Sequence, residues 1–102
     1  MALILHADRS VEVLDVLDAP GGRPTLEQLQ GAVGGMIELV RCARLDAYLV
    51  VNEEGLLKGL PYNGVASYLA SYTEGRRSVT IVGPAVLATP AEINDPPEPA
   101  DG

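Results

Sequence analysis

The chain has 102 residues, enough for one hydrophobic core and too few for two independent ones, so a single domain is expected. Hydrophobic residues make up 47% of the sequence, but Phe and Trp are absent, which predicts an aliphatic core. The net charge of -7 opposes nucleic-acid phosphates, and the single cysteine excludes an internal disulfide and a cysteine-based metal cluster.

The chain begins with two β-prone runs that predict a hairpin. They are residues 2–6 and 11–17, and the polar residues Asp8, Arg9 and Ser10 separate them. Residues 18–24 follow with two prolines and two glycines, which predict a connecting loop.

A helix is predicted to begin at Thr25. Thr25 and Gln28 have the spacing of a capping box, in which each side chain satisfies a backbone N–H of the first turn. Three apolar residues then fall on one helix face: Leu26, Leu29 and Val33. Gly34 and Gly35 are expected to end the helix, because glycine readily adopts the left-handed conformation of a C-terminal cap.

Residues 36–41 and 47–52 are predicted to form consecutive strands that pair antiparallel. Asn52 and Gly55 occupy the first and fourth positions of a predicted type I turn. We expect this turn to lead into a further hairpin strand at residues 56–58.

A second helix is predicted after Asn63, which can serve as its N-cap. An apolar stripe at helical spacing is expected to face the core: Val65, Tyr68, Leu69 and Tyr72. Residues 79–88 form the last predicted strand, interrupted at Gly83 and Pro84 by a bulge or bend.

The chain is therefore expected to hold one α/β domain of the α+β type at residues 1–88. Its single mixed, mainly antiparallel sheet would carry the Thr25 helix on one face and the second, short helix at one end. Residues 89–102 contain four of the eight prolines and no basic residue, which predicts a Pro-rich acidic C-terminal tail.

Catalytic and metal-site motifs are not found in the sequence. His6 is the only histidine and lies in an apolar run, and no G-x-S-x-G elbow accompanies a serine. No ligand spacing typical of zinc or calcium occurs, so we expect neither a metal site nor a cofactor. Glu38 lies among apolar neighbours, which predicts an exposed strand face or a charged partner such as Lys58.

Four blocks of sequence resemble a known family. They are GGMIE at residues 34–38, VVNEEG at 50–55, GLPYN at 59–63 and IVGPA at 81–85. Over most of residues 1–88 the chain resembles the phage and plasmid proteins of domain of unknown function 3846. The resemblance implies a small accessory protein of a mobile element, without an established activity. Pro84 and the Pro-rich tail depart from the family pattern.

The resemblance also implies that the polar motif residues Glu38, Asn52, Glu53 and Asn63 belong together. We expect a ligand- or partner-binding surface at Glu38, Asn52, Glu53, Leu60, Pro61, Tyr62 and Asn63. A structural role is the alternative, in which Asn52 makes the turn, Pro61 stiffens the loop and Asn63 caps the helix.

The expected function is that of a non-enzymatic accessory binding protein in the host cytoplasm. It would modulate a host protein or sequester a small signalling molecule as an anti-defence protein. A small hydrolase-like enzyme with Glu38 or Glu53 as general base is the alternative. No apolar run approaches the roughly 20 residues of a membrane span, so no membrane association is expected.

Sequence-independent binding to DNA or RNA is predicted to be absent, because Arg76 and Arg77 are the only adjacent basic pair in a chain of charge -7. A mobility-shift assay at low salt should detect no complex. Tight, salt-sensitive complexes would contradict this prediction.

A homo-oligomer is predicted, because a thin sheet flanked by one substantial helix leaves an apolar face to cover. Sedimentation equilibrium should show association at tens of micromolar, about the range of weak symmetric contacts. A monomer at that concentration would count against the prediction.

Overall fold

The computed structural model describes residues 2–14, 23–42, 45–71 and 79–93. These residues contain five strands and three helices. In chain order they are β1 (Ala2–Leu5), β2 (Val11–Leu14), α1 (Leu26–Val33), β3 (Ile37–Cys42), β4 (Ala47–Asn52), α2 (Gly64–Ser71), β5 (Ala85–Ala88) and α3 (Pro90–Ile93).

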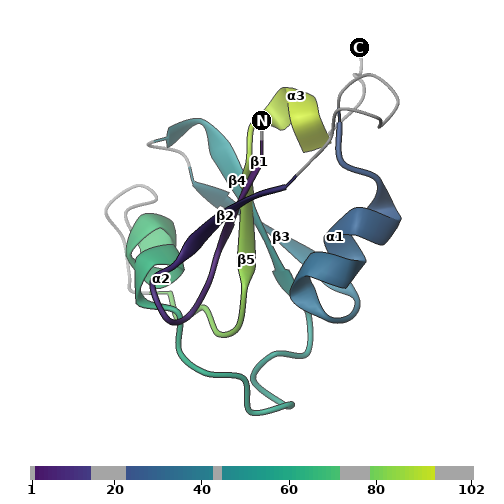
Figure 1. The fold of residues 1–102 in the computed structure, drawn as a ribbon. Helices are drawn as coiled ribbons and strands as arrows, with labels where there is room; N and C mark the ends of the chain where they lie inside the picture. Colours follow the sequence, from purple (N-terminus) through teal and green to yellow (C-terminus); the bar gives the residue numbers. More distant parts are fainter. Residues whose placement is uncertain (1, 15–22, 43–44, 72–78, 94–102) are drawn as a thin grey trace.

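The strands form one sheet in the order β2-β1-β5-β4-β3, and all neighbouring strands are antiparallel (Figure 1). β1 and β2 form the predicted hairpin, and β3 and β4 form a second hairpin. The last strand, β5, lies between the two hairpins. The expected α+β class and antiparallel sheet are therefore confirmed.

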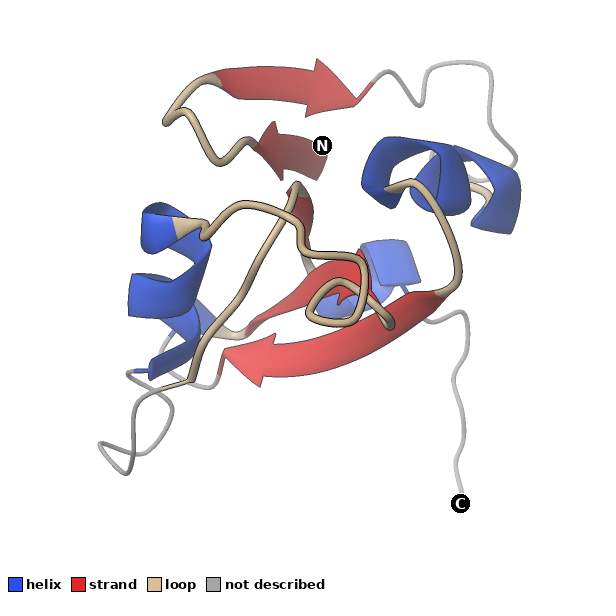
Figure 2. Ribbon diagram, turned by 90° about the horizontal axis from the view of Figure 1, so that it is seen from below, coloured by secondary structure: helices blue, strands red, loops and turns tan. Residues whose placement is uncertain are grey.

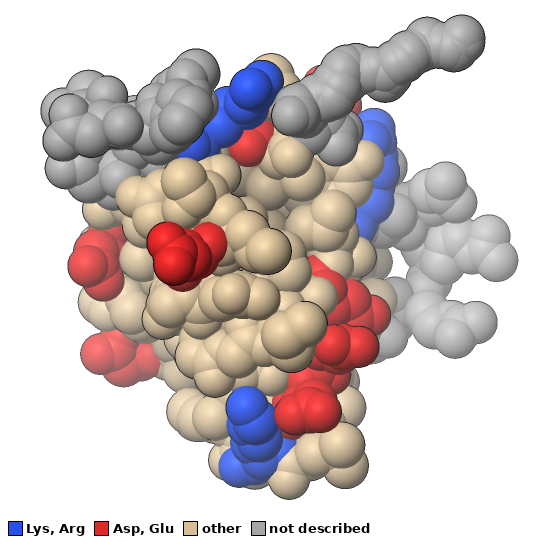
Figure 3. Space-filling model, turned by 90° about the vertical axis from the view of Figure 1, so that its right-hand side faces the viewer, with Lys and Arg blue, Asp and Glu red and all other residues tan. Residues whose placement is uncertain are grey.

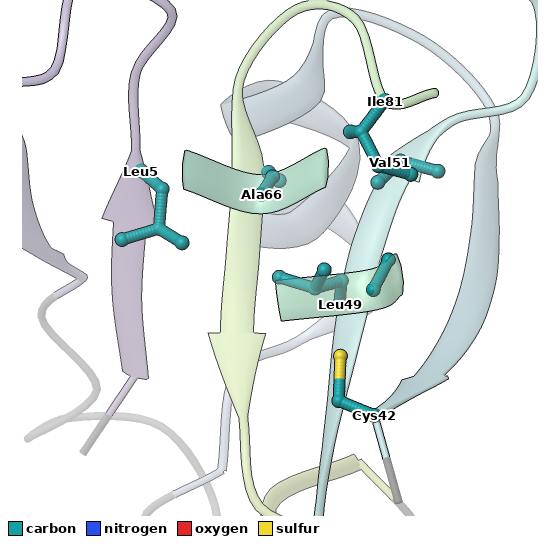
Figure 4. Close-up of a cluster of buried hydrophobic side chains, with 8 residues drawn as sticks. Leu5, Cys42, Leu49, Val51, Ala66 and Ile81 are labelled. Atoms are coloured by element: carbon teal, nitrogen blue, oxygen red, sulfur yellow. The ribbon is translucent and has the colours of Figure 1, made fainter. Parts of the chain in front are cut away.

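Helices cover both faces of the sheet. On one face α1 packs over buried side chains that include Ile4, Val50 and Val86. On the other face α2 places Ala66 and Ala70 in a second cluster, with Leu5, Leu49, Val51 and Ile81 among its members (Figure 4). Figures 1 and 2 show the two helices on opposite sides of the strands.

The expectation that the second helix lies at an end of the sheet is therefore wrong. β4 and β5 carry apolar residues at successive positions, so both of their faces are apolar and both require a covering layer.

Both predicted ends of α1 are confirmed. The Gln28 N–H donates to Thr25 Oγ1 at 3.1 Å, and the Thr25 N–H donates to Gln28 Oε1 at 2.9 Å. Gly34 ends the helix with a φ of 82°, in the left-handed region that glycine tolerates best.

Asn63 is fully buried and joins three parts of the fold. Its Nδ2 donates to the carbonyl oxygens of Leu5 at 2.9 Å and Gly83 at 2.8 Å. Its Oδ1 accepts from the Ala66 N–H at 3.1 Å, which is the predicted N-cap contact of α2. One amide therefore ties the start of α2 to β1 and to the segment before β5.

The buried face of α2 differs from the predicted apolar stripe. Ala66, Ser67 and Ala70 are buried, whereas Val65 is 41% and Tyr68 is 61% exposed. Leu69 is partly buried against the core as predicted, and Tyr72 lies outside the described residues. Small residues face inward because α2 approaches its neighbours closely enough for hydroxyl contacts, a distance that a tyrosine side chain would not allow.

The turn at Asn52 is confirmed, but no strand follows at residues 56–58. The Gly55 N–H donates to the Asn52 carbonyl at 3.1 Å, and residues 53–59 then continue as turns. The Lys58 and Leu60 N–H groups donate to the carbonyls of Glu54 and Gly55, at 2.9 and 3.1 Å. These local bonds occupy the donors that a strand would use in a ladder.

Only the last four residues of the predicted 79–88 strand form β5, because the chain bends at Gly83 and Pro84 as expected. Gly83 has a φ of 75°, and an added Cβ would lie 2.7 Å from Leu60 Cδ1. Before the bend, Val82 makes an isolated antiparallel pair with Tyr62.

A short helix, α3, follows β5 within the segment that was expected to be a tail. The Thr89 N–H donates to Glu92 Oε1 at 2.9 Å, and the Glu92 N–H donates to Thr89 Oγ1 at 3.3 Å, so the two form a capping box. Burial alone would raise the pKa of Glu92, but hydrogen bonds, those from Thr89 among them, outweigh it and lower this pKa. Ile93 packs on the α1 side of the sheet, and residues 94–102 lie outside the described residues.

None of the described helices has the length and apolar character needed to cross a membrane.

Asn63→Ala is predicted to lower the free energy of unfolding by about 3 kcal/mol, because it leaves several buried backbone groups without a partner. Urea unfolding followed by circular dichroism measures the change. The exposed substitution Glu27→Ala should change the same quantity by less than about 0.5 kcal/mol and serves as control. A loss below about 1 kcal/mol for Asn63→Ala would contradict the proposed structural role.

Candidate functional site

An open hollow of about 410 Å³ lies between β3, the turn that follows β4 and the segment 79–82. Three of the predicted site residues line it: Glu38, Asn52 and Glu53. The remaining lining residues are Val40, Val51, Gly55, Leu56, Leu57, Val79, Thr80, Ile81 and Val82. The hollow therefore combines apolar walls with two carboxylates.

The register of the β3–β4 hairpin places Glu38 in this hollow. Glu38 pairs with Val51 and Val40 pairs with Leu49, so these four side chains share the face that α2 covers. Glu38 is exposed at the edge of that face, as the sequence indicated. The start of β3 lies beside the end of β4, as predicted, because the connection between the two strands is short.

Asn52 lines the hollow, but its amide is used inside the protein. Its Nδ2 donates to the Val33 carbonyl at 3.0 Å, and its Oδ1 accepts from the Glu54 N–H at 2.8 Å. These bonds connect the end of α1 to the turn after β4. A Cβ on Gly35 would lie 3.0 Å from both Asn52 Nδ2 and Lys58 Nζ, which explains why a glycine stands there.

The segment 79–82 forms the wall next to α2, and two serines of α2 hold it. Ser67 Oγ accepts from the Ile81 N–H at 2.7 Å and donates to the Ile81 carbonyl at 3.2 Å. Ser71 Oγ makes the same two contacts with Val79, at 2.8 and 3.3 Å. The hydroxyls therefore take the place of a partner strand for alternate residues of this segment.

The other two residues of the segment direct their backbone groups away from α2. Val82 faces Tyr62 in a pair whose flanking bonds are Asn63 N–H to Ile81 carbonyl, 2.9 Å, and Gly83 N–H to Pro61 carbonyl, 2.7 Å. In such a pair the N–H and carbonyl of the central residues point outward. Within the described part of the chain, the backbone groups of Thr80 and Val82 have no hydrogen-bond partner.

The charge of the hollow is negative. Glu38 and Glu53 are both exposed, and no lysine or arginine occurs among the described residues that line it. Figure 3, which looks onto the side that carries α1 and not onto the face that α2 covers, shows acidic side chains at several places on that side, the largest group of them at its right-hand edge. The site therefore suits a neutral or cationic group better than an anion.

The rest of the predicted binding surface lies elsewhere. Leu60 is half-buried against Gly55 and Gly83, Pro61 and Tyr62 are exposed, and Asn63 is buried. None of these four residues lines the hollow, because the contacts of Asn63 turn this loop toward β1. The structure therefore does not bring residues 60–63 into this hollow, although one surface with Glu38, Asn52 and Glu53 was expected.

The predicted site did not include the segment 79–82, that is Val79, Thr80, Ile81 and Val82. Two features of the sequence could have indicated them. Ser67 and Ser71 lie four residues apart on one helix face, and Gly83-Pro84 marks where the segment leaves the sheet.

Other candidate sites in the described structure have fewer groups suited to binding or catalysis. A second hollow of about 270 Å³ has an almost wholly apolar lining: Leu3, Leu45, Ala47, Leu87, Ala88 and Thr89. Burial raises the pKa of the Cys42 thiol, which disfavours the reactive thiolate. Among the described residues, no three His, Cys, Asp or Glu side chains are grouped to hold a metal ion.

Comparison with known proteins identifies the family. A sequence model of the family described as domain of unknown function (DUF3846) matches residues 1–96, so the chain belongs to that family. No curated protein and no solved structure matches the chain.

Ser67→Ala is predicted to lower the free energy of unfolding by about 1–3 kcal/mol, because Ile81 then keeps a buried N–H without an acceptor. Amide hydrogen exchange at Ile81 should become faster as well. Ser71→Ala, at a half-buried position, should have a smaller effect and provides the matched comparison. Unchanged exchange at Ile81 would show that the hydroxyl does not hold the segment.

Proposed function

We propose that this member of the family is a non-enzymatic binding protein that holds part of another protein in the hollow beside residues 79–82. The observation that carries the proposal is the combination, in one open hollow, of apolar walls, two carboxylates and the backbone groups of Thr80 and Val82, which have no partner among the described residues. Sites that bind other molecules typically combine a mainly apolar lining with a few placed polar groups.

The exposed leucines of the turn after β4 support a binding role. Leu56 is 71% exposed and Leu57 is 88% exposed, and both line the hollow. Holding large apolar side chains in water is unfavourable, and a contiguous group of them is typical of an interaction surface.

Between the two binding roles expected from the sequence, the shape of the hollow favours modulation of a protein. Sequestration of a small signalling molecule calls for an enclosed pocket, whereas both carboxylates and both leucines of this hollow are exposed. The setting in the cytoplasm of a host infected by a phage, or carrying a related element, remains part of the proposal and rests on the family resemblance.

A small hydrolase is the alternative function, with Glu38 or Glu53 as general base. Both carboxylates line the same hollow, which is the observation in its favour. It predicts that purified protein hydrolyses an activated ester and that Glu38→Gln with Glu53→Gln abolishes this activity. Activity that survives in the double variant would remove these residues from a catalytic role.

The binding proposal is tested by titrating ¹⁵N-labelled protein with a fragment collection that contains amines, carboxylates, neutral amides and dipeptides. The bound fragments should shift the amide resonances of Val51, Glu53, Thr80 and Val82. Thr80→Trp should remove these shifts, because the larger side chain fills the hollow from an exposed position.

Leu26→Trp is the matched control, since Leu26 is 58% exposed on α1 and does not line the hollow. It should leave the fragment shifts unchanged. Fragments that shift only resonances elsewhere, or no fragment shifts at all, would overturn the proposed function.

A further inference from the structure

We propose that the occupant of the hollow is an extended peptide segment that carries a basic side chain and adds as a strand along residues 79–82. This inference rests on the proposed function, because it names the class of partner for the same site.

The backbone of residues 79–82 carries the first part of the argument. Val79 and Ile81 direct their N–H and carbonyl groups to the serine hydroxyls of α2. Thr80 and Val82 therefore direct theirs to the opposite side, where the described chain supplies no partner. This arrangement leaves a row of donors and acceptors at the spacing of a strand edge, and an extended peptide is the ligand that matches such a row.

The inner side of the segment cannot take this partner, because the hydroxyls of Ser67 and Ser71 occupy it. The outer side borders the hollow, whose lining includes all four residues of the segment. An added strand would thus lie inside the hollow rather than beside it. Val40 and Leu57 then offer apolar contacts to alternate side chains of the peptide.

Charge complementarity identifies the kind of side chain. Glu38 and Glu53 come from different elements, β3 and the turn after β4, and both line the same hollow. No basic residue in the described lining neutralises them. A lysine or arginine of the peptide can reach these carboxylates while the peptide backbone pairs with Thr80 and Val82. The chain's net charge of -7 also favours the approach of a basic segment over an acidic one.

The first experiment compares two capped peptides, Val-Lys-Val-Lys-Val and Val-Glu-Val-Glu-Val, by titration calorimetry with the intact protein. The lysine peptide should bind at least about tenfold more tightly than the glutamate peptide, and added salt should reduce the difference. Each of Glu38→Gln and Glu53→Gln should lower the affinity for the lysine peptide by about twofold to fivefold, the range expected for the loss of an exposed ion pair. In the double variant Glu38→Lys with Glu53→Lys the preference should shift toward the glutamate peptide.

The second experiment tests pairing along the strand. Two N-methylated forms of the lysine peptide are compared, one methylated at odd and one at even residues. Since only alternate N–H groups of an added strand face its partner, one form should lose at least about tenfold in affinity and the other should retain binding. Butylamine serves as the probe for a simple cation site. Because Glu38 and Glu53 are exposed, their substitution in the first experiment should leave folding intact.

The outcomes separate the inference from the proposed function. If fragments shift the amide resonances of the residues that line the hollow but neither peptide binds, the hollow is a binding site and the peptide inference is wrong. Equal effects of both N-methylated forms, or butylamine binding as tightly as the lysine peptide, would also overturn strand addition. If no fragment shifts the amide resonances of the residues that line the hollow and no peptide binds, the proposed function itself fails.

Discussion

The buried amide of Asn63 is the contact on which the arrangement of α2 depends. Because Asn63 caps the helix with its side chain turned into the protein, the residues three, four and seven positions later face the same way. Those residues are Ala66, Ser67 and Ala70, and they are the buried residues of the helix. The rotation of α2 about its axis, and with it the position of the Ser67 hydroxyl, therefore follows from one capped amide.

The hollow is a consequence of pairing between a helix and an extended segment. A strand would have bonded residues 79–82 within the plane of the sheet, and β4 would then have continued beside them. Instead the hydroxyls of Ser71 and Ser67 bond Val79 and Ile81, and Gly83, with a φ of 75°, lies at the bend that leads into β5. The hollow lies between this segment, β3 and the turn after β4.

Local signals in the sequence predicted much of the fold. The capping box of Thr25 and Gln28, the turn at Asn52 and the β3–β4 pairing each depend on residues close together in the chain. For the same reason the proximity of Glu38, Asn52 and Glu53 could be predicted from the sequence, since a short hairpin has one favoured register.

What the sequence did not predict depends on contacts between distant residues. Hydrophobic periodicity predicted that Val65 and Tyr68 would be buried, but both are exposed. The close approach of α2 to residues 79–81 favours small residues on the inner face of the helix. Val79 and Ile81 bond to serine hydroxyls of α2, and the alternation of apolar and polar residues that predicts a strand does not indicate such partners. Of the residues that line the hollow, the predicted binding surface therefore included only Glu38, Asn52 and Glu53.

The central place of β5 has a consequence for the order in which the chain can fold. Each hairpin, β1–β2 and β3–β4, closes a short loop and can form early, but the two share no ladder until β5 lies between them. On the ribosome, the two halves of the sheet cannot join before residues 85–88 have been synthesised. Because β5 joins the two hairpins, we expect the sheet to assemble in one late cooperative step.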